Sequence, residues 1–355
     1  MNQGNLARKS AETQLEIGRV ELEPWSTARA EWIAMVERSP DATVFHTCRW
    51  IESILAAYRF RIYVAALRSP QGAMLAGVPL AQSSQFWRQK LVALPYSDFC
   101  APLEDEPGAA EILMAQLAAK QGLPPIEVRG FDAPAPWHKF EMFQRWIVNT
   151  EGSAEQIQQR FSRNFRAHIR RAETSGFVVE RVDGADGLRR FYELIVTSRR
   201  QKGLPTQPAG FFRTIAKGMG DDAQIWFTIH AGRDLAVEFA LTHRDCIYGK
   251  WMARAHDAGT GATEILIRKL ILSHLGTHRR FDVGRTDMRN KGLVNFKRQH
   301  GAEPSPLPYV FTPDPPGNIS SEHVTGTRAL AMRLWPKLPR PVAEGLSAFI
   351  YRYLS

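Results

Sequence analysis

The sequence has few cysteines, no long apolar run and none of the motifs that mark several large enzyme classes. Its three cysteines, Cys48, Cys100 and Cys246, are odd in number and share no metal-like spacing, which argues against a disulfide framework and a zinc site. No segment approaches the roughly 18–20 apolar residues that a membrane-spanning helix needs. Residues 1–16 are polar and lack the apolar core of a secretion signal. We therefore expect a cytoplasmic protein without a bound metal.

A phosphate-binding P-loop, a metal-binding His/Glu pair and a serine-hydrolase elbow are also missing from the sequence. What is present is an ordinary globular composition, with 44% hydrophobic and 23% charged residues. A length of 355 residues suits two domains better than one core. The formal charge of +10 indicates an anionic partner, such as nucleic acid, a nucleotide phosphate or a membrane surface. Charge alone does not choose among these partners.

The order of expected elements repeats along the chain. Apolar periodicity predicts a helix over 47–58, a hairpin over 61–81 and a strand over 90–94. A similar order follows later, with a helix over 188–202, strands over 224–230, 235–242 and 245–253, and a helix over 262–275. We interpret this as two α/β units, over residues 15–150 and 151–311, followed by a loop and helical tail over 312–355 that packs back on them.

The segment 281–309 contains the densest group of candidate site residues. A short strand over 281–284 ends in a glycine, and a polar loop and a short helix follow. Loops after strands commonly carry binding and catalytic groups in α/β proteins. We expect a pocket lined by Arg285, Asp287, Asn290 and Lys297. The alternative is a well-bonded polar turn around the glycines.

An arginine-rich helix is expected after residue 154. Arg163, Arg166 and Arg170 are spaced so that they share one helical face, and guanidinium groups bind phosphate well. A solvated charged face is the commoner explanation for such a run. This face has almost no acidic residue before Glu173 to pair with, however, which favours phosphate binding.

Two further segments suggest chemistry. In the turn around Pro95, Asp98 could accept a proton from an attacking amine or orient it, and Tyr96 could contact substrate; a turn-capping aspartate is an equal alternative. Gly259 and Gly261 lie between an expected strand and helix, where backbone N–H groups can hold a phosphate, although a flexible loop explains them as well. Lys250, on the preceding strand, is either a second anion contact or an edge lysine.

Segments 94–103, 163–176 and 281–298 together resemble the FemAB-like and BioF2-like acetyltransferase families, both branches of the GNAT superfamily. The resemblance implies two tandem GNAT-like α/β domains, each a mixed sheet flanked by helices. It also implies transfer of an acyl or aminoacyl group to an amine or hydroxyl of a cell-envelope or polysaccharide precursor. Acyl-CoA or aminoacyl-tRNA would be the donor, with no tightly bound cofactor. The expected CoA turn has His256 where the family places Arg or Gln.

The resemblance and the charge together predict the partners. We expect an anionic substrate, either a nucleotide-linked or phosphorylated precursor or tRNA, and a monomer that can contact the inner membrane surface peripherally. The alternative from a different class is a non-catalytic phosphate- or RNA-binding protein built on a decayed transferase fold. Turnover that depends on a donor would separate the two.

Overall fold

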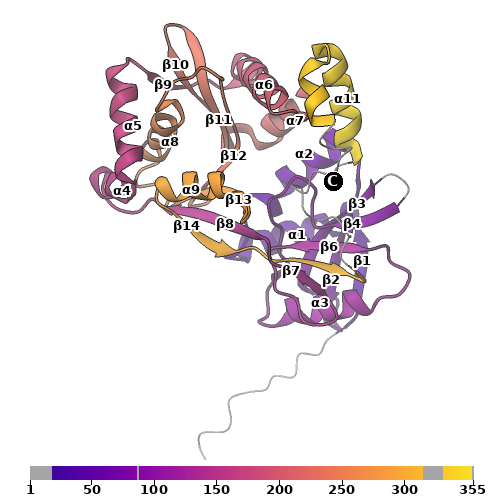
Figure 1. Cartoon of the computed structure of the whole chain (residues 1–355). Coiled ribbons are helices and arrows are strands. Elements are labelled where there is room, and N and C mark those ends of the chain that lie inside the picture. The colour runs from indigo at the N-terminus through magenta and orange to yellow at the C-terminus, as the bar shows by residue number, and fades with distance from the viewer. Residues whose placement is uncertain (1–17, 86–87, 315–330, 354–355) are drawn as a thin grey trace, which may run out of the picture.

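The computed structural model describes residues 18–85, 88–314 and 331–353, which form two lobes, each built on one mixed β-sheet (Figure 1). Helices pack against both sheets, so the expected α/β fold class is confirmed. No helix within these ranges is long and apolar enough to cross a membrane.

The first sheet has the strand order β1-β2-β3-β4-β6-β15-β7, with β5 paired to β3. Its strands are β1 (Val20–Pro24), β2 (Arg61–Arg68), β3 (Met74–Gln85), β4 (Arg88–Val92), β5 (Leu103–Glu104), β6 (Ile126–Arg129), β7 (His138–Phe140) and β15 (Tyr309–Thr312). The helices of this lobe are α1 (Trp25–Arg38), the 3₁₀ turn η1 (Val44–His46), α2 (Cys48–Tyr58) and α3 (Ala109–Ala119).

The second sheet has the order β14-β8-β13-β12-β11-β10-β9. Its strands are β8 (Phe143–Asn149), β9 (Val178–Arg181), β10 (Ala223–His230), β11 (Arg233–His243), β12 (Cys246–Arg254), β13 (Arg280–Asp287) and β14 (Ala302–Pro306). Its helices are α4 (Ala154–Arg160), α5 (Arg163–Thr174), α6 (Gly184–Gln201), α7 (Ala209–Met219), the 3₁₀ turn η2 (Gly220–Asp222), α8 (Ala262–Ser273) and α9 (Lys291–Gln299).

Both sheets follow one plan. Four antiparallel strands lead to a parallel pair, β4 with β6 in one sheet and β12 with β13 in the other. A helix connects each parallel pair, as such crossovers require. In the second sheet the parallel pairing covers only Cys246–Tyr248 against Arg280–Asp282, and the two strands then diverge. Diverging strands leave backbone groups available for a ligand.

The two sheets exchange one strand each. β8 follows β7 in the chain but lies in the second sheet, between β13 and β14. β15 follows β14 but lies in the first sheet, between β6 and β7. A domain boundary near residue 150 therefore stays a prediction, since β8 precedes that residue in the chain but belongs to the second sheet.

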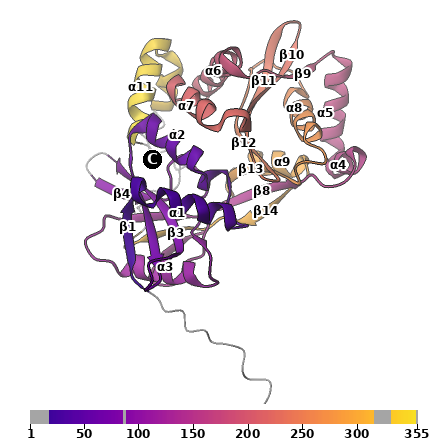
Figure 2. The same ribbon diagram turned by 180° about the vertical axis from the view of Figure 1, so that it is seen from behind.

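Apolar side chains cover the second sheet on both faces. α6 and α7 pack on one face, where Phe212 and Phe239 meet Trp251, and α8 covers the other face (Figures 1 and 2). α7 also packs against α2 of the first lobe. This helix pair joins the lobes close to the point where β12 and β13 diverge.

The expected long helix after residue 154 is two helices. α4 ends at Arg160, and Ser162 begins α5 by accepting a hydrogen bond from the N–H of Phe165 at 3.1 Å. Serine is a favourable N-cap, which gives a local reason for the break.

The end of the chain contacts both lobes. The 3₁₀ turn η3 (Trp335–Lys337) and α11 (Arg340–Tyr353) follow a stretch, 315–330, that lies outside the described residues and includes most of the expected loop. Arg340 forms an ion pair of 2.6 Å with Glu193 of α6, and the hydroxyl of Tyr96 donates to the carbonyl of Tyr351.

Candidate functional site at the junction of the two sheets

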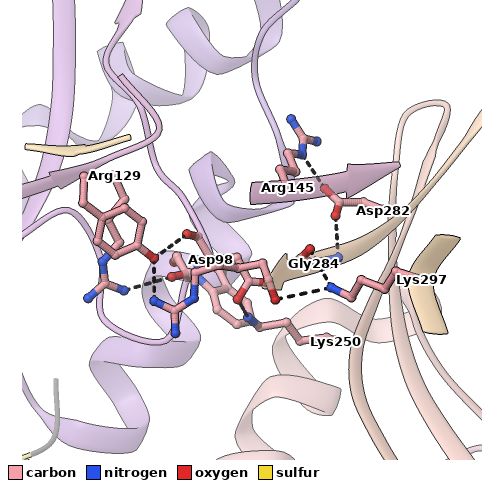
Figure 3. A network of polar contacts seen from close by, with 11 residues as sticks. Asp98, Arg129, Arg145, Lys250, Asp282, Gly284 and Lys297 are labelled. Carbon is pink, nitrogen blue, oxygen red and sulfur yellow. Dashed lines mark hydrogen bonds and ion pairs between the residues drawn. The ribbon is translucent and has the colours of Figure 1, made fainter. Parts of the chain in front are cut away.

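Asp98 of the first lobe and Lys250 of the second form an ion pair, with 3.0 Å between Asp98 Oδ1 and Lys250 Nζ (Figure 3). The lysine side chain is 7% exposed and the aspartate side chain 25% exposed, so the pair is largely shielded and open mainly on the carboxylate side. Arg285 and Lys297 also act on this carboxylate. Four of the residues expected from sequence therefore lie in one cluster.

The turn that carries Asp98 is strained and firmly held. Leu94 and Tyr96 have φ values of 50° and 67°, in the left-handed region that costs a non-glycine residue about 1–3 kcal/mol. Two bonds to Ser97 hold the turn: Trp50 Nε1 donates to its hydroxyl at 2.8 Å, and Arg129 Nη1 donates to its carbonyl at 3.0 Å. These bonds fix the direction of the following carboxylate.

Lys250 is placed by a bulge in β12. Phe239 of β11 pairs with Trp251, while the next residue, Ala240, pairs with Gly249, so Lys250 is the extra residue. Bulges re-aim side chains and are common beside functional sites. The ammonium lies 5.0 Å from the centre of the Phe45 ring, a cation–π contact with the first lobe.

Gly284 interrupts β13 on the other side of the divergence. Its φ is +74°, and the pairing of β13 with β8 shifts between Asp282 and Arg285. Asp282 Oδ1 accepts a hydrogen bond from the Gly284 N–H at 2.7 Å, and Asp282 Oδ2 accepts one from Arg145 Nε at 2.6 Å (Figure 3). An added Cβ at Gly284 would lie 3.3 Å from Asp98 Oδ2, so glycine lets the two lobes approach here.

Lys297 reaches the same point from α9. Its Nζ donates to the carbonyls of Gly284 at 2.9 Å and Arg285 at 3.3 Å (Figure 3). The residue is 5% exposed, and burial lowers the pKa of its ammonium to about 8. An ammonium group near its pKa at neutral to slightly alkaline pH can give up a proton readily.

Arg285 is held by aromatic side chains. Its Nη1 donates to the Tyr309 hydroxyl at 2.9 Å, and that hydroxyl donates to the Asp98 carbonyl at 3.0 Å. The guanidinium also lies 4.4 Å from the centre of the Phe143 ring. β15 and β8, the two exchanged strands, supply Tyr309 and Phe143, so the exchange helps to build the cluster.

The charge states of the central pair follow from its surroundings. Burial alone would raise the pKa of Asp98, but Lys250, Arg285 and Lys297 together lower it. Burial lowers the pKa of Lys250, and the partner carboxylate opposes this shift. Asp98 is therefore ionised at neutral pH and suits the binding of a cation or a hydroxyl better than the removal of a proton.

Three expected site residues have local structural partners. Tyr96 stacks on Tyr58, with 4.7 Å between ring centroids, and its hydroxyl is bonded to the tail at Tyr351. Asp287 accepts from the backbone and guanidinium of Arg289, and Asn290 caps α9 by accepting from the Leu293 N–H at 3.0 Å. Substrate contact by these residues stays a prediction.

The expected arginine clamp is divided by the structure. Arg166 Nη1 donates to the carbonyls of Gln159 at 3.1 Å and Phe161 at 2.5 Å, which caps the end of α4. Arg163 and Arg170 are exposed on α5. Two of the three arginines are therefore exposed and the third caps α4, and phosphate binding by Arg163, Arg166 and Arg170 stays a prediction.

Gly259 and Gly261 precede α8 with φ values of +75° and +96°. An added Cβ at Gly261 would come within 2.2 Å of the His168 carbonyl, so close packing of α5 already requires this glycine. Next to Gly259 the nearest atom would be Phe177 Cζ at 3.6 Å, which leaves more room there. Donor binding by this turn stays a prediction.

Sequence reasoning missed Glu238, Asp282, Arg145 and Tyr309. Glu238 is 1% exposed, and its Oε2 has no hydrogen-bond partner in the part of the chain that the structure describes. A single acidic residue within the apolar run of β11 was the available signal for Glu238. The pairing of Arg145 with Asp282 depends on the strand exchange, which no local pattern reveals.

A separate cavity of about 640 Å³ lies between α6, α7 and the edge of the second sheet, and none of its lining residues belongs to the Asp98 cluster. Within residues 18–85, 88–314 and 331–353 no group of three or more His, Cys, Asp or Glu is placed to hold a metal ion.

Comparison with known proteins finds one matching domain family and several similar folds. Residues 159–298 match the family of acetyltransferase (GNAT) domains, and a search of curated proteins found no match. The crystal structure of FemX covers 79% of this chain and 95% of its own, at a TM-score of 0.59 and 14% identity. L-PGS from Bacillus licheniformis covers 86% of this chain and 96% of its own, at a TM-score of 0.53 and 14% identity. The C-terminal domain of a putative lysylphosphatidylglycerol synthetase from Agrobacterium fabrum covers 79% of this chain and 92% of its own, at a TM-score of 0.52 and 14% identity.

At this level of identity the structural likenesses show the fold, whereas the domain match covers the part of the second lobe that contains Lys250, Gly284 and Lys297. The second lobe accordingly contains an acetyltransferase (GNAT) domain over residues 159–298, and the chain as a whole has a fold similar to that of FemX.

Proposed function

We propose that the chain is an acyltransferase that transfers an acyl or aminoacyl group to an amine or hydroxyl of a cell-envelope or polysaccharide precursor. The Asp98–Lys250 ion pair carries this proposal, because it joins the two lobes at the point where β12 and β13 diverge. The chemistry needs a donor on one side of this point and an acceptor on the other.

The donor binds along the divergence in the second lobe. Its carbonyl oxygen lies near Lys250, whose positive charge stabilises the oxyanion that forms when the nucleophile attacks. The nucleophile forms a new bond to the acyl carbon, and the bond between that carbon and the carrier's sulfur or oxygen breaks. Lys297 gives a proton to the leaving group, for which its lowered pKa of about 8 is suitable.

The acceptor approaches Asp98 from the first lobe. An ionised carboxylate binds an ammonium or hydroxyl group and orients it toward the acyl carbon. The proton of the nucleophile leaves to solvent, since the lowered pKa of Asp98 makes its carboxylate a weak base. Positioning rather than general-base catalysis is thus the role that the electrostatics support.

The donor class is open between acyl-CoA and aminoacyl-tRNA. The GNAT match favours acyl-CoA, while one structural neighbour is described as a domain of a putative lysylphosphatidylglycerol synthetase, whose product carries an aminoacyl group. Exposed Arg163 and Arg170 would suit either a nucleotide phosphate or tRNA.

A binding panel followed by a transfer assay tests the proposal. Thermal shifts are measured with acetyl-CoA, longer acyl-CoAs, aminoacyl-tRNA and a UDP-linked muropeptide, because a ligand at 100 times its Kd adds about 2.7 kcal/mol of stability. Labelled acyl transfer is then measured for wild type, Lys297→Met and the exposed control Lys291→Met. We expect a loss of about 10²–10⁴ in rate for Lys297→Met alone.

The alternative function, phosphate or RNA binding without turnover, makes a different prediction for the same panel. It gives a stabilising shift with uncharged tRNA as large as with aminoacyl-tRNA, and no labelled product with any donor. That pattern would overturn the proposed transferase activity.

A further inference from the structure

Glu238 is a buried carboxyl group in a strand of apolar side chains. Its neighbours in β11, Val237 and Phe239, are fully buried, and Glu238 itself is 1% exposed. Its Oε2 has no hydrogen-bond partner among the residues that the structure describes. A carboxyl group in such a place is stable only when it is neutral or near a compensating charge.

Two glycines connect Glu238 to Lys297. An added Cβ at Gly249 would lie 3.0 Å from Glu238 Oε1, and an added Cβ at Gly284 would lie 3.9 Å from the Gly249 carbonyl. The Gly284 carbonyl accepts a hydrogen bond from Lys297 Nζ at 2.9 Å. Glu238 and Lys297 therefore approach one point, the divergence of β12 and β13, from β11 and α9. The missing side chains at both glycines leave room for this approach.

Lys297 has hydrogen-bonding capacity beyond its bonds to the carbonyls of Gly284 and Arg285, because an ammonium group has three N–H donors. The other charged or titratable groups that act on it come from four elements around the site: Asp98 of the first lobe, Asp282 and Arg285 of β13, Glu238 of β11 and His300 after α9. Asp282 is paired with Arg145, and Asp98 with Lys250, so Glu238 is the acid in this group without a cationic partner in contact.

The two groups lose protons in the same pH range. Burial raises the pKa of Glu238 to about 8, and the charge of Lys297 opposes this shift. Burial lowers the pKa of Lys297 to about 8, while Asp98, Asp282 and Glu238 oppose that shift. Groups that interact in this way titrate as a pair rather than independently.

We propose that Glu238 is a positioning residue that acts through Lys297, the charge of each side chain acting on the other beneath the divergence of β12 and β13. A neutral Glu238 leaves Lys297 ready to release its proton, and an ionised Glu238 retains the proton on Lys297. The consequence of this coupling for catalysis rests on the proposed acyl transfer, in which Glu238 sets the pH at which Lys297 protonates the leaving group. The pairing itself does not depend on any substrate.

Infrared spectroscopy tests the pairing without a substrate. A protonated carboxylic acid has a carbonyl-stretch band that disappears on ionisation, and the difference between wild type and Glu238→Gln isolates the band of Glu238 from that of Asp282. We expect this band at pH 6 and a midpoint for its loss near 8. Lys297→Met should move the midpoint upward by at least about one pH unit, because the compensating charge is gone.

Two variants make the result specific. Lys297→Arg retains the positive charge and should keep the midpoint near that of wild type, while Lys291→Met, an exposed change on the same helix, should leave it unmoved. An unchanged midpoint in Lys297→Met, or no acid band in wild type at pH 6, would overturn the inference. Thermal melts of Glu238→Gln give a second measurement. Between about pH 5 and 8 the unfolded wild type has lost the Glu238 proton that the folded state still holds, so wild type loses stability as the pH rises. The variant lacks this loss, and its melting temperature should rise relative to that of wild type over the same range.

The pH dependence of acyl transfer is a separate readout. If transfer occurs, Glu238→Gln should move the alkaline limb of the rate profile, whereas a purely structural role would lower the rate equally at all pH values. If no donor is transferred but Lys297→Met moves the infrared midpoint of Glu238, the proposed function fails and the coupling of Glu238 to Lys297 stands.

Discussion

Asp98 and Lys250 lie 152 positions apart in the chain, in separate lobes, and yet form the contact of 3.0 Å around which the candidate site is built. Because each side chain comes from a different lobe, the pair contributes both to the chemistry and to the joining of the lobes. These two contributions can be separated by mutation.

A double-mutant cycle measures the pair. Lys250→Met leaves a partly buried carboxylate without its contacting cation, and removing one partner of a buried pair typically costs about 3–5 kcal/mol. We expect about 3 kcal/mol here, because Asp98 is 25% exposed and other cations remain nearby. Chemical denaturation of Asp98→Asn with Lys250→Met should recover most of the loss. Arg29→Met, which removes an exposed ion pair with Glu52, is the control and should change little.

Gly284 should matter for both backbone and site. Gly284→Ala adds left-handed strain of about 1–2 kcal/mol and places a methyl group 3.3 Å from Asp98 Oδ2. Gly276→Ala has similar strain at a φ of +81° but no atom within 4 Å of the added carbon. We expect similar losses of stability in the two variants and a loss of donor-dependent transfer only in Gly284→Ala. Equal rates of donor-dependent transfer in the two variants would show that Gly284 is not part of the active site.

Arg166 should behave as a structural residue. Arg166→Ala removes charged hydrogen bonds to the end of α4, each typically worth about 1.5–3 kcal/mol, so the free energy of unfolding should fall measurably. Arg170→Ala, on the exposed surface of the same helix, should leave stability nearly unchanged but weaken the thermal shift given by an anionic ligand. The reverse pattern would favour phosphate binding by Arg166 over a structural role.

His46 predicts acid sensitivity. Burial lowers the pKa of His46 to about 4, although its bond to the Ala101 carbonyl opposes the shift. In the unfolded chain the group titrates at its ordinary value of 6.5, so the unfolded state gains a proton first as the pH falls. Stability should therefore fall by roughly 1.4 kcal/mol per pH unit from about 6.5 toward 4 because of this group.

The measurement is the difference in slope between wild type and His46→Asn. Chemical denaturation at several pH values should show a smaller acid loss in the variant, whereas the exposed control His256→Asn should retain the slope of wild type. Parallel slopes in wild type and His46→Asn would show that His46 is not the acid-sensitive group.

The sequence and the structure agree best where local pattern and resemblance point to the same residues. The helix over 47–58 and the strands around 224–253 follow from apolar periodicity, and the structure has them as α2, β10, β11 and β12. Asp98 was expected as a site residue from the turn around Pro95, and Arg285 and Lys297 were expected to line a pocket in the segment 281–309. The structure brings them to one cluster, while their catalytic roles remain predictions.

Contacts between residues far apart in the chain could not be predicted from the sequence. The contact between Arg145 and Asp282 exists because β8 lies in the second sheet, and no spacing along the chain encodes this placement. Asp287 and Asn290 were expected to line a pocket, and their side chains also accept hydrogen bonds from neighbouring backbone groups, so substrate contact by them stays a prediction. A cluster of polar residues in a loop after a strand does not show whether their side chains line a pocket or bond to the neighbouring backbone.

The exchange of β8 and β15 means that the two lobes cannot be treated as separable modules. A fragment cut at residue 150 would carry β8 away from β13 and β14, and would leave β6 and β7 without β15 between them. Each half would then expose unpaired strand edges, which favour aggregation. The halves must therefore complete each other during folding, and any recombination that swaps one lobe for a relative's must carry both crossing strands with it.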